Sequence, residues 1–147
     1  MIYKRIDNVS DPDIPYLIEI LKLPEFSRFI SIDEHNYWNY VTKTENVFYY
    51  KVLENGSLVA AIHCEISNKT LYMDIMVFPE HQRKGLATNI LKDIKSDKLP
   101  LDFDRIEVAV DESNTASIKL FEKMNFEFVS KQDELLNYVF TKTLNIK

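Results

Sequence analysis

The chain has 147 residues, of which 46% are hydrophobic and 28% charged, so we expect one globular domain over residues 1–147. A net charge of -5 argues against a broad nucleic-acid-binding surface, and no apolar run is long enough to span a membrane. The single cysteine, Cys64, allows no intramolecular disulfide, and the N-terminal MIYKRIDNV lacks the apolar core of a signal peptide. We therefore expect a cytoplasmic protein without a membrane or nucleic-acid partner.

The first third of the chain predicts one strand followed by two helices. Residues 2–9 alternate in polarity and are expected to form a strand, and Asp11-Pro12 then starts a helix that Leu23-Pro24 ends. Ser31 and Glu34 have the spacing of a capping box, which predicts a second helix. The residues expected on one side of that helix are Tyr37, Tyr40 and Val41.

Three successive strands are predicted next, and they form an antiparallel meander. Residues 47–53, 58–66 and 70–78 are rich in β-branched and aromatic side chains. Asn55-Gly56 joins the first two strands, because both residues tolerate the positive φ that a two-residue hairpin turn needs. Asn68-Lys69 turns the chain again into the third strand.

The last third predicts a strand, a helix and two further strands. Residues 103–110 alternate in polarity, Ser113-Asn114 can cap the helix that follows, and Asn125 is expected to end it in the left-handed conformation. The two last strands and the loop between them are expected at 126–129, 135–141 and 131–133. The resulting order, β-α-α-β-β-β-α-β-α-β-β, predicts an α/β fold with a mixed sheet.

The stretch from Met73 to Ser96 carries the strongest functional signal. A strand ends at Pro79, which lacks a backbone N–H, and after Gly85 the hydrophobic period changes to that of a helix. Residues 82–87, QRKGLA, form a basic loop between the two. A loop that leads into a helix presents unpaired N–H groups and partial positive charge, which together bind phosphate. Gly85 lets a ligand approach the backbone closely.

Two blocks of the sequence resemble the GNAT superfamily of N-acetyltransferases. Residues 82–87, preceded by Val77-x-Pro79, are similar to the acyl-CoA pyrophosphate loop of that family. Residues 114–126 resemble its second CoA-contacting segment, commonly Asn-x-x-Ala-x-x-Leu-Tyr-x-x-x-Gly-Phe. The predicted order of elements is also the GNAT order. The resemblance therefore covers nearly the whole chain and implies the GNAT fold.

This resemblance implies an acetyl-CoA-dependent N-acetyltransferase and assigns its cofactor contacts. Backbone N–H groups of residues 83–88 would hold the pyrophosphate, pantetheine would run along residues 75–77 like an added strand, and the N–H of Val77 would stabilise the oxyanion. The implied cofactor-binding residues are Ile75, Met76, Val77, Gln82, Arg83, Lys84, Gly85, Leu86, Ala87, Thr88, Asn114, Ser117 and Phe121. A helix N-cap explains Asn114 equally well. No metal ligands are implied.

Amine acetylation also needs a base, because an alkyl amine with a pKa of about 10.4 is mostly protonated at neutral pH. Asp74, on the central strand beside the implied cofactor residues, is the first candidate, and a structural carboxylate is the alternative role for it. His63 and Glu65 lie on the neighbouring strand. Because adjacent strand residues point to opposite faces, His63 does not pair with Cys64, and Cys64 is expected in the core.

The sequence departs from the family at the residue that protonates the leaving thiolate. Many relatives have a tyrosine that protonates the thiolate, whereas the matching residue here is Phe121, which has no proton to give. A positioned acid usually contributes roughly 10²–10⁴-fold, although a thiolate whose thiol has a pKa of about 8.5 leaves acceptably unaided. Tyr138, Tyr72 or water are the candidates to supply the proton.

The expected acceptor is a primary amine of a small molecule, a peptide or a protein. The segment between the first two helices is unusually aromatic, and Trp38 and Arg28 are the candidates in it to contact the acceptor. Exposed aromatic surface near Trp38 would also support a homodimer. Two other functions stay open: a GNAT-fold module that binds acyl-CoA without turnover, which Phe121 favours, and an unrelated α/β interaction domain.

Overall fold

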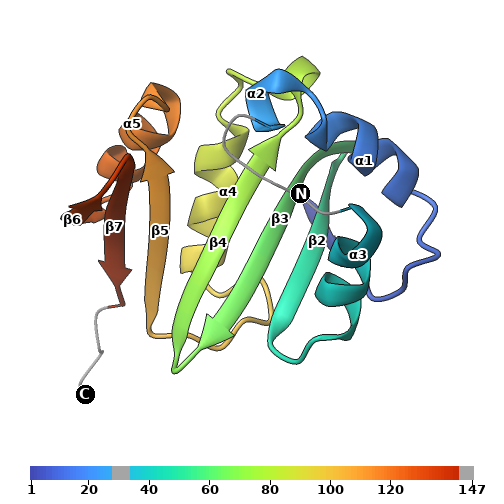
Figure 1. Cartoon of the computed structure of the whole chain (residues 1–147), viewed down its shortest axis with the longest axis horizontal. Coiled ribbons are helices and arrows are strands. Elements are labelled where there is room, and N and C mark those ends of the chain that lie inside the picture. Colours follow the sequence, from blue (N-terminus) through green and yellow to red (C-terminus); the bar gives the residue numbers. More distant parts are fainter. Residues whose placement is uncertain (28–33, 143–147) are drawn as a thin grey trace. The chain divides into compact units, whose positions relative to one another are not determined.

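The structure is a computed structural model that describes residues 1–27 and 34–142. Its seven strands form one sheet in the order β1-β2-β3-β4-β5-β7-β6 (Figure 1). The strands are β1 (Ile2–Arg5), β2 (Val47–Glu54), β3 (Ser57–Ser67), β4 (Thr70–Val77), β5 (Arg105–Asp111), β6 (Glu127–Gln132) and β7 (Leu135–Thr141). The helices are α1 (Ile14–Leu21), α2 (Pro24–Ser27), α3 (Glu34–Lys43), α4 (Leu86–Lys95) and α5 (Thr115–Lys123), with a 3₁₀ turn η1 at Pro79–His81. The predicted α/β class with a mixed sheet is confirmed.

The N-terminal elements differ from the prediction in two details. Helix α1 begins at Ile14 rather than near Asp11, because the Asp11 side chain accepts the N–H of Asp13 at 2.9 Å and holds a turn there. The short helix α2 was not predicted. It starts at Pro24, whose fixed φ suits a first helical position, and it buries Phe26. None of the helices in the described part of the chain is long and apolar enough to span a membrane.

The predicted turns are confirmed, with one shift. Asn55 and Gly56 have φ of 51° and 81°, and Asn68 and Lys69 have φ of 50° and 64°. Positive φ at both turn residues matches the right-handed twist of the strands that they connect. The last hairpin turns later than expected, after Gln132, with Asp133 at a φ of 56°.

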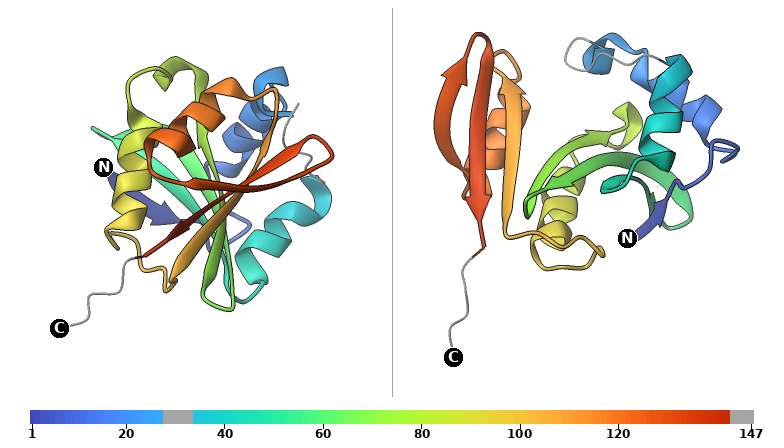
Figure 2. Two further views of the ribbon diagram at one scale, coloured as in Figure 1. Left: turned by 90° about the vertical axis from the view of Figure 1, so that its left-hand side faces the viewer. Right: turned by 60° about the horizontal axis from the view of Figure 1, so that its bottom comes forward.

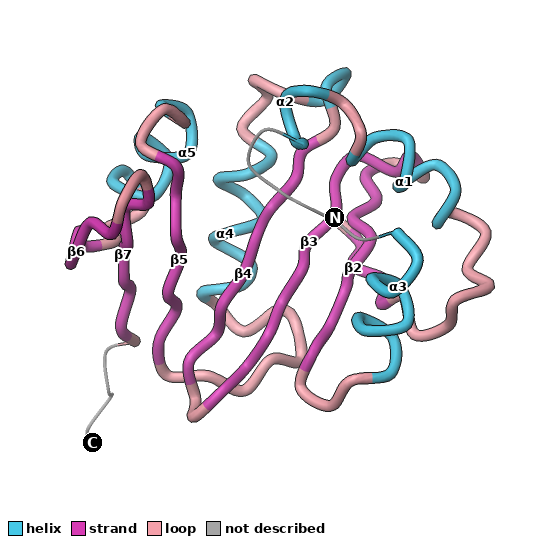
Figure 3. The backbone as a smooth tube through the Cα atoms, viewed as in Figure 1, coloured by secondary structure: helices cyan, strands magenta, loops and turns pink. Residues whose placement is uncertain are grey.

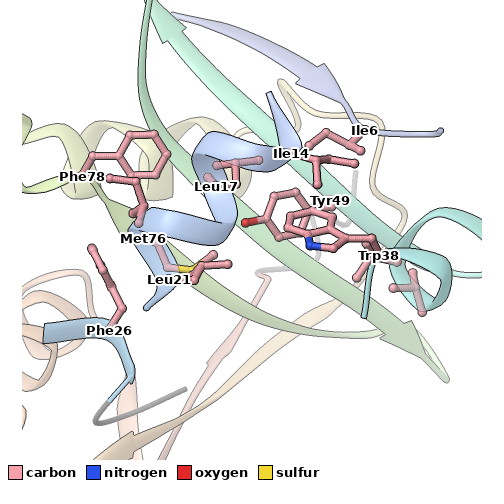
Figure 4. Packing of buried hydrophobic residues seen from close by; sticks show 13 residues of the cluster. Ile6, Ile14, Leu17, Leu21, Phe26, Trp38, Tyr49, Met76 and Phe78 are labelled. Carbon is pink, nitrogen blue, oxygen red and sulfur yellow. The ribbon is translucent and has the colours of Figure 1, made fainter. Parts of the chain in front are cut away.

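The chain folds as two compact units, residues 1–65 with 75–84 and residues 66–74 with 85–147. The expectation of a single domain stays a prediction. In the first unit, α1 and α3 lie on one face of β2 and β3 (Figures 1 and 2). Figure 4 shows the core that they enclose, whose labelled members are Ile6, Ile14, Leu17, Leu21, Phe26, Trp38, Tyr49, Met76 and Phe78.

A buried ion pair fixes the segment before α1 to the sheet of the first unit. The ammonium of Lys51 on β2 lies 2.8 Å from a carboxylate oxygen of Asp13 and 3.0 Å from one of Asp11. Burial disfavours the charged form of Lys51, but hydrogen bonds and the charges of Asp13 and Asp11 outweigh it and raise its pKa. Because the charge is neutralised where it is buried, this pair is structural.

In the second unit, β5 lies between the start of β4 and β7. It pairs in parallel with β4 over only three residues, from Thr70 to Tyr72, and antiparallel with β7 over its whole length. Beside this sheet, the ammonium of Lys95 on α4 donates to the carbonyl of Met124 at 2.9 Å and lies 4.1 Å from the ring centre of Phe140. These contacts join α4, the end of α5 and β7.

Candidate active site

The site begins where β4 ends. The N–H of Phe78 donates to the carbonyl of Val59 on β3 at 3.0 Å. Backbone groups of successive residues in an extended chain point to opposite edges, so the N–H and carbonyl of Val77 point away from β3. The side-chain amide of Gln82 donates to that carbonyl at 2.9 Å, which agrees with this orientation. Ile75, two residues earlier, has the same orientation.

Gln82 braces the loop that follows. Besides Val77, its side-chain amide lies 3.2 Å from a carboxylate oxygen of Glu25, and η1 closes the turn with a bond from the N–H of His81 to the carbonyl of Phe78 at 2.8 Å. The predicted role of Gln82 in cofactor binding stays a prediction. In the structure, the Gln82 side chain stabilises the connection from β4 to α4, which can be followed in Figure 3.

Two residues with positive φ bring the chain into α4. Arg83 has a φ of 64° and Gly85 a φ of 77°. Gly85 is the N-cap residue, so it offers no side-chain oxygen, and the first turn of the helix contains no acidic residue. The first intrahelical bond runs from the N–H of Asn89 to the carbonyl of Gly85 at 3.1 Å. The N–H groups of residues 86–88 therefore precede the hydrogen bonds of the helix.

This helix start has the features of a phosphate site. The side chains of Arg83 and Lys84 are exposed immediately before it. A Cβ built on Gly85 would meet nothing within 4 Å, so the space beside its backbone is open, and only the positive φ restricts substitution there. Open N–H groups, the helix dipole and two adjacent cationic side chains fit the phosphates of a nucleotide cofactor.

The second predicted block forms the start and end of α5. The side-chain oxygen of Asn114 accepts the N–H of Ser117 at 3.3 Å, so its N-cap role is confirmed, while its contact to CoA stays a prediction. Before it, the carboxylate of Asp111 accepts both the N–H of Ser113 at 2.9 Å and its hydroxyl at 2.7 Å. The side chains of Asn114 and Asp111 therefore each accept hydrogen bonds from nearby groups of the chain at this helix start.

At the end of α5, Asn125 has a φ of 65°, as predicted. The N–H of Phe126 donates to the carbonyl of Phe121 at 2.9 Å, the N–H of Asn125 donates to the carbonyl of Glu122, and the rings of Phe121 and Phe126 lie 5.0 Å apart. This is a Schellman motif with its usual hydrophobic contact. Phe121 is 7% exposed and is explained by this packing.

The predicted catalytic residues lie in different surroundings. Asp74 is exposed on β4, whereas Met76 is buried in the core of the first unit. Tyr138 on β7 is buried, and its burial, the charge of Glu122 and a hydrogen bond to Glu122 raise its pKa. Tyr72 is 42% exposed. Catalytic roles for Asp74, Val77 and Tyr138 stay predictions.

Sequence reasoning did not assemble a cluster of four polar side chains on α3 and β3. The hydroxyl of Tyr37 lies 2.5 Å from Nδ1 of His63, and Nε2 of His63 lies 3.5 Å from Oε1 of Glu65. The hydroxyl of Tyr40 donates to the same Glu65 oxygen. We call these four residues the tyrosine–histidine–glutamate cluster. The three-residue spacing of the tyrosines on a helix and the two-residue spacing on a strand place each pair on one face, which was the available signal.

Trp38 lies in the core. Its indole is only 5% exposed and packs against the ring of Tyr49, with 5.0 Å between their centres, and its contact to the acceptor stays a prediction. The exposed aromatic side chain of α3 is Tyr40, at 43%. Arg28, and Ser31 of the predicted capping box, lie outside the described residues. Cys64 is fully buried, as predicted.

The sequence matches the acetyltransferase (GNAT) family over residues 14–126, which is most of the chain and includes both predicted blocks. This chain belongs to the GNAT family. The resemblance stated from residues 77–87 and 114–126 is therefore confirmed at the level of the family.

Individual relatives agree with this assignment. The GNAT chain is 29% identical over 129 residues to an N-alpha-acetyltransferase of Saccharolobus solfataricus, covering 85% of this chain and 72% of that protein. It is similar in structure to the spermidine N-acetyltransferase of Vibrio cholerae in complex with CoA and spermine, with a TM-score of 0.78, 14% identity and coverage of 95% of this chain and 94% of that chain.

Two further solved structures show the same fold. The ribosomal-protein-S18-alanine N-acetyltransferase of Escherichia coli has a TM-score of 0.71 at 17% identity, with 99% of each chain covered. The N-acetyltransferase PseH of Campylobacter jejuni, in complex with acetyl coenzyme A, has a TM-score of 0.70 at 13% identity and covers 97% of this chain and 100% of that chain. At these identities the likeness establishes the GNAT fold.

Proposed function

We propose that this GNAT protein is an N-acetyltransferase that moves an acetyl group from acetyl-CoA to a primary amine by direct attack in a ternary complex. The observation that carries the proposal is the start of α4, which has no side-chain cap and no first-turn carboxylate and follows two exposed basic residues. Such a helix start binds an anion of the pyrophosphate type. Acetyl-CoA, when bound, supplies the activated acyl group.

Residues of the loop and residues of β4 bind different parts of this cofactor. Backbone N–H groups of residues 83–88 hold the pyrophosphate, and Arg83 and Lys84 add positive charge. The edge of β4 that faces away from β3 presents the backbone groups of Ile75, which hydrogen-bond to pantetheine as a neighbouring strand would, and the N–H of Val77, which faces the thioester. The second segment that contacts acetyl-CoA in this proposal consists of Asn114, Ser117 and Phe121.

Val77 and Asp74 perform the central steps in this proposal. The N–H of Val77 donates to the acyl oxygen as negative charge develops on it, and losing one such donor typically costs about 2.7–4 kcal/mol of barrier. Asp74 accepts a proton from the acceptor ammonium, directly or through water, and so generates the nucleophilic amine. The exposure of the Asp74 residue supports this role.

Tyr138 or water protonates the leaving thiolate. Burial and the neighbouring Glu122 raise the pKa of Tyr138, so its hydroxyl carries a proton at neutral pH. A second candidate function is an acyl-CoA-binding module without turnover. The observation that favours it is Phe121, which replaces the tyrosine of many relatives and is occupied with packing against Phe126.

The proposed acceptor is a small molecule, a peptide or a protein with a primary amine. The names of the relatives, which include N-alpha-acetyltransferase and spermidine N-acetyltransferase, support an amine acceptor in general. We also propose that residues 1–147 act as one domain in the cytoplasm. Association into a homodimer would have to use a surface other than Trp38, which is buried.

Calorimetric titration of the purified chain with acetyl-CoA tests the proposal. We expect saturable binding at one site, followed by release of free thiol when a suitable amine is added. Binding without thiol release from any amine in a broad panel would favour the module without turnover. A folded sample that does not bind acetyl-CoA would contradict both functions and leave an α/β interaction domain.

A further inference from the structure

The tyrosine–histidine–glutamate cluster of the first unit is not used by the proposed chemistry, and its contacts define where its protons lie. A carboxylate only accepts hydrogen bonds, so Nε2 of His63, which faces Glu65 at 3.5 Å, carries the proton of the neutral ring. Nδ1 of the same ring then accepts from the hydroxyl of Tyr37 at 2.5 Å. Hydroxyl, imidazole and carboxylate follow one another as in a catalytic triad, with a phenol in place of the serine.

The two tyrosines of the cluster hold different partners. The hydroxyl of Tyr40 donates to Oε1 of Glu65. That hydrogen bond, burial and the charge of Glu65 raise the pKa of Tyr40, so its hydroxyl keeps its proton. The hydroxyl of Tyr37 faces a ring nitrogen that can take up a proton. A hydroxyl can accept through its lone pairs while it donates, so Tyr37 can pass a proton on to the imidazole.

The register of the first unit places the cluster on the covered face of β3. The N–H of Phe78 donates to the carbonyl of Val59, so these residues are opposite one another on antiparallel strands. Counted from this pair, Ala61 is opposite Met76, and both belong to the core of the first unit. His63 follows Ala61 by two residues and therefore points to the same face, on which α3 lies (Figure 1).

The proposed function uses the same stretch of the strands. Its pantetheine contact is the backbone of Ile75, which by the same count is opposite Ile62, the residue before His63. Asp74, which the proposed function makes the acceptor of the first proton, directly precedes Ile75 in the chain. A reacting amine beside this stretch of β4 is therefore level with His63.

Acetylation of an ammonium group releases two protons from its nitrogen. The first leaves before the attack, and the proposed function gives it to Asp74. Once the C–N bond has formed, the nitrogen of the tetrahedral adduct is cationic and loses the second proton as the C–S bond breaks. The leaving thiolate takes up one proton, and the other passes to solvent. The chemistry therefore benefits from a second proton acceptor beside the amine.

We propose that the cluster is this second proton acceptor, with Tyr37 as the catalytic residue that contacts the amine. This inference rests on the proposed function for the place of the reacting amine. The oxygen of Tyr37 takes the proton of the adduct nitrogen while the phenolic proton moves to Nδ1 of His63. The carboxylate of Glu65 stabilises the imidazolium that results, and the imidazolium then returns a proton to solvent.

Single-turnover release of thiol from acetyl-CoA tests this relay. The probes are a capped lysine, a short peptide with a free α-amine, spermidine and 2-phenylethylamine, and the fastest of them is used with every variant. Tyr37→Phe keeps the ring and is expected to lower the maximal rate by roughly 10²-fold, with unchanged Kd for acetyl-CoA and unchanged half-saturation by the amine. Tyr40→Phe removes the same group from the same helix. Its hydroxyl only holds Glu65, so we expect a smaller loss.

His63→Ala shows whether the imidazole acts as a base. We expect a loss similar to that of Tyr37→Phe, and partial recovery of the rate when free imidazole is added, because the missing ring leaves space for it. A merely structural role of His63 would not give recovery that depends on a base. Tyr37→Phe, which imidazole is not expected to restore, covers the case of a His63→Ala protein that fails to fold.

The outcomes that overturn the relay differ from those that overturn the proposed function. A wild-type rate in Tyr37→Phe, an equal loss in Tyr40→Phe, or no recovery of folded His63→Ala with imidazole contradicts only the relay. No thiol release by the wild-type protein with any of the probes contradicts both. Titration with acetyl-CoA then shows whether that protein still binds the cofactor.

Discussion

Two strand-to-helix connections of this chain lead into helices of nearly equal length but leave different backbone groups open. Between β4 and α4, the N-cap is Gly85, which has no side chain with which to cap the helix. Between β5 and α5, Asn114 caps the helix, and Asp111 closes the preceding turn through Ser113. The first helix start leaves its N–H groups to a ligand, whereas the second satisfies a helix N–H from within the chain.

The difference between the two helix starts shows that a strand-to-helix connection can either leave backbone N–H groups open or stabilise the helix with a side-chain cap. A side-chain cap typically contributes about 1 kcal/mol to stability, so a helix start without one gives up that stabilisation. At α4 the loss leaves open N–H groups next to two exposed basic residues, which is where we propose that the cofactor binds. At α5 the cap is kept, and the motif at the other end of the helix, built on Phe121 and Phe126, adds to the packing. The two blocks of the GNAT resemblance are thus an open helix start and a closed one.

The largest effect is expected from Gly85→Glu. We expect it to abolish acetyl-CoA binding in a calorimetric titration, because it places a negative charge at the open end of α4. Gly85→Ala is the matched control. It shares the left-handed φ, which costs about 1–2 kcal/mol of stability, but its methyl group meets open space and should leave binding nearly unchanged. Normal binding by Gly85→Glu would contradict the assignment of the loop.

Asp74→Asn is expected to act on rate and not on cofactor affinity. We expect kcat to fall by roughly 10²–10⁴-fold and the acid limb of its pH profile to flatten, because an amide cannot accept the proton. Asp111→Asn, at the end of β5, is the comparison. Its carboxylate is bound to Ser113, so that change should lower thermal stability with little effect on the pH profile. An unchanged profile in Asp74→Asn would exclude Asp74 as the base.

Phe121→Ala is expected to lower the free energy of unfolding by about 3–5 kcal/mol, as for a large buried aromatic side chain. Denaturant unfolding measures this change. Phe128→Ala, in the same unit but with its side chain 55% exposed, is the control and should change stability by about 0.5 kcal/mol or less. A small loss in Phe121→Ala would show that the contact with Phe126 contributes little to α5.

The smallest effect is expected from Asn114→Ala. Loss of the side-chain cap should lower stability by about 1 kcal/mol, seen as a lower Tm. Thr115→Ala, at the exposed next position, should change Tm less, since its hydroxyl is not the cap. If Asn114→Ala also weakens acetyl-CoA binding at unchanged fold, Asn114 contacts the cofactor as well. Equal Tm values for both variants would contradict the cap.

The site was predictable where it depends on neighbours in the sequence. The loop before α4, the hairpin turn at Asn55-Gly56 and the left-handed residue Asn125 were all predicted, because turn and cap geometry is set by a few adjacent residues. The short helix α2 was missed, since a single turn of helix has almost no periodic signal. The sequence left the surroundings of Trp38 undecided, because an aromatic residue in a helix gives the same pattern whether it faces a core or solvent.

Apart from the short helix α2, the sequence by itself determined the order of elements, and it determined the family, because these follow from local periodicity and from motifs of adjacent residues. Only the tertiary structure decided which polar side chains meet. Tyr37 and His63 are 26 residues apart in the chain, and their hydrogen bond exists because α3 packs on the strands that follow it. Contacts of this kind depend on which faces are buried together, and no local pattern encodes that pairing.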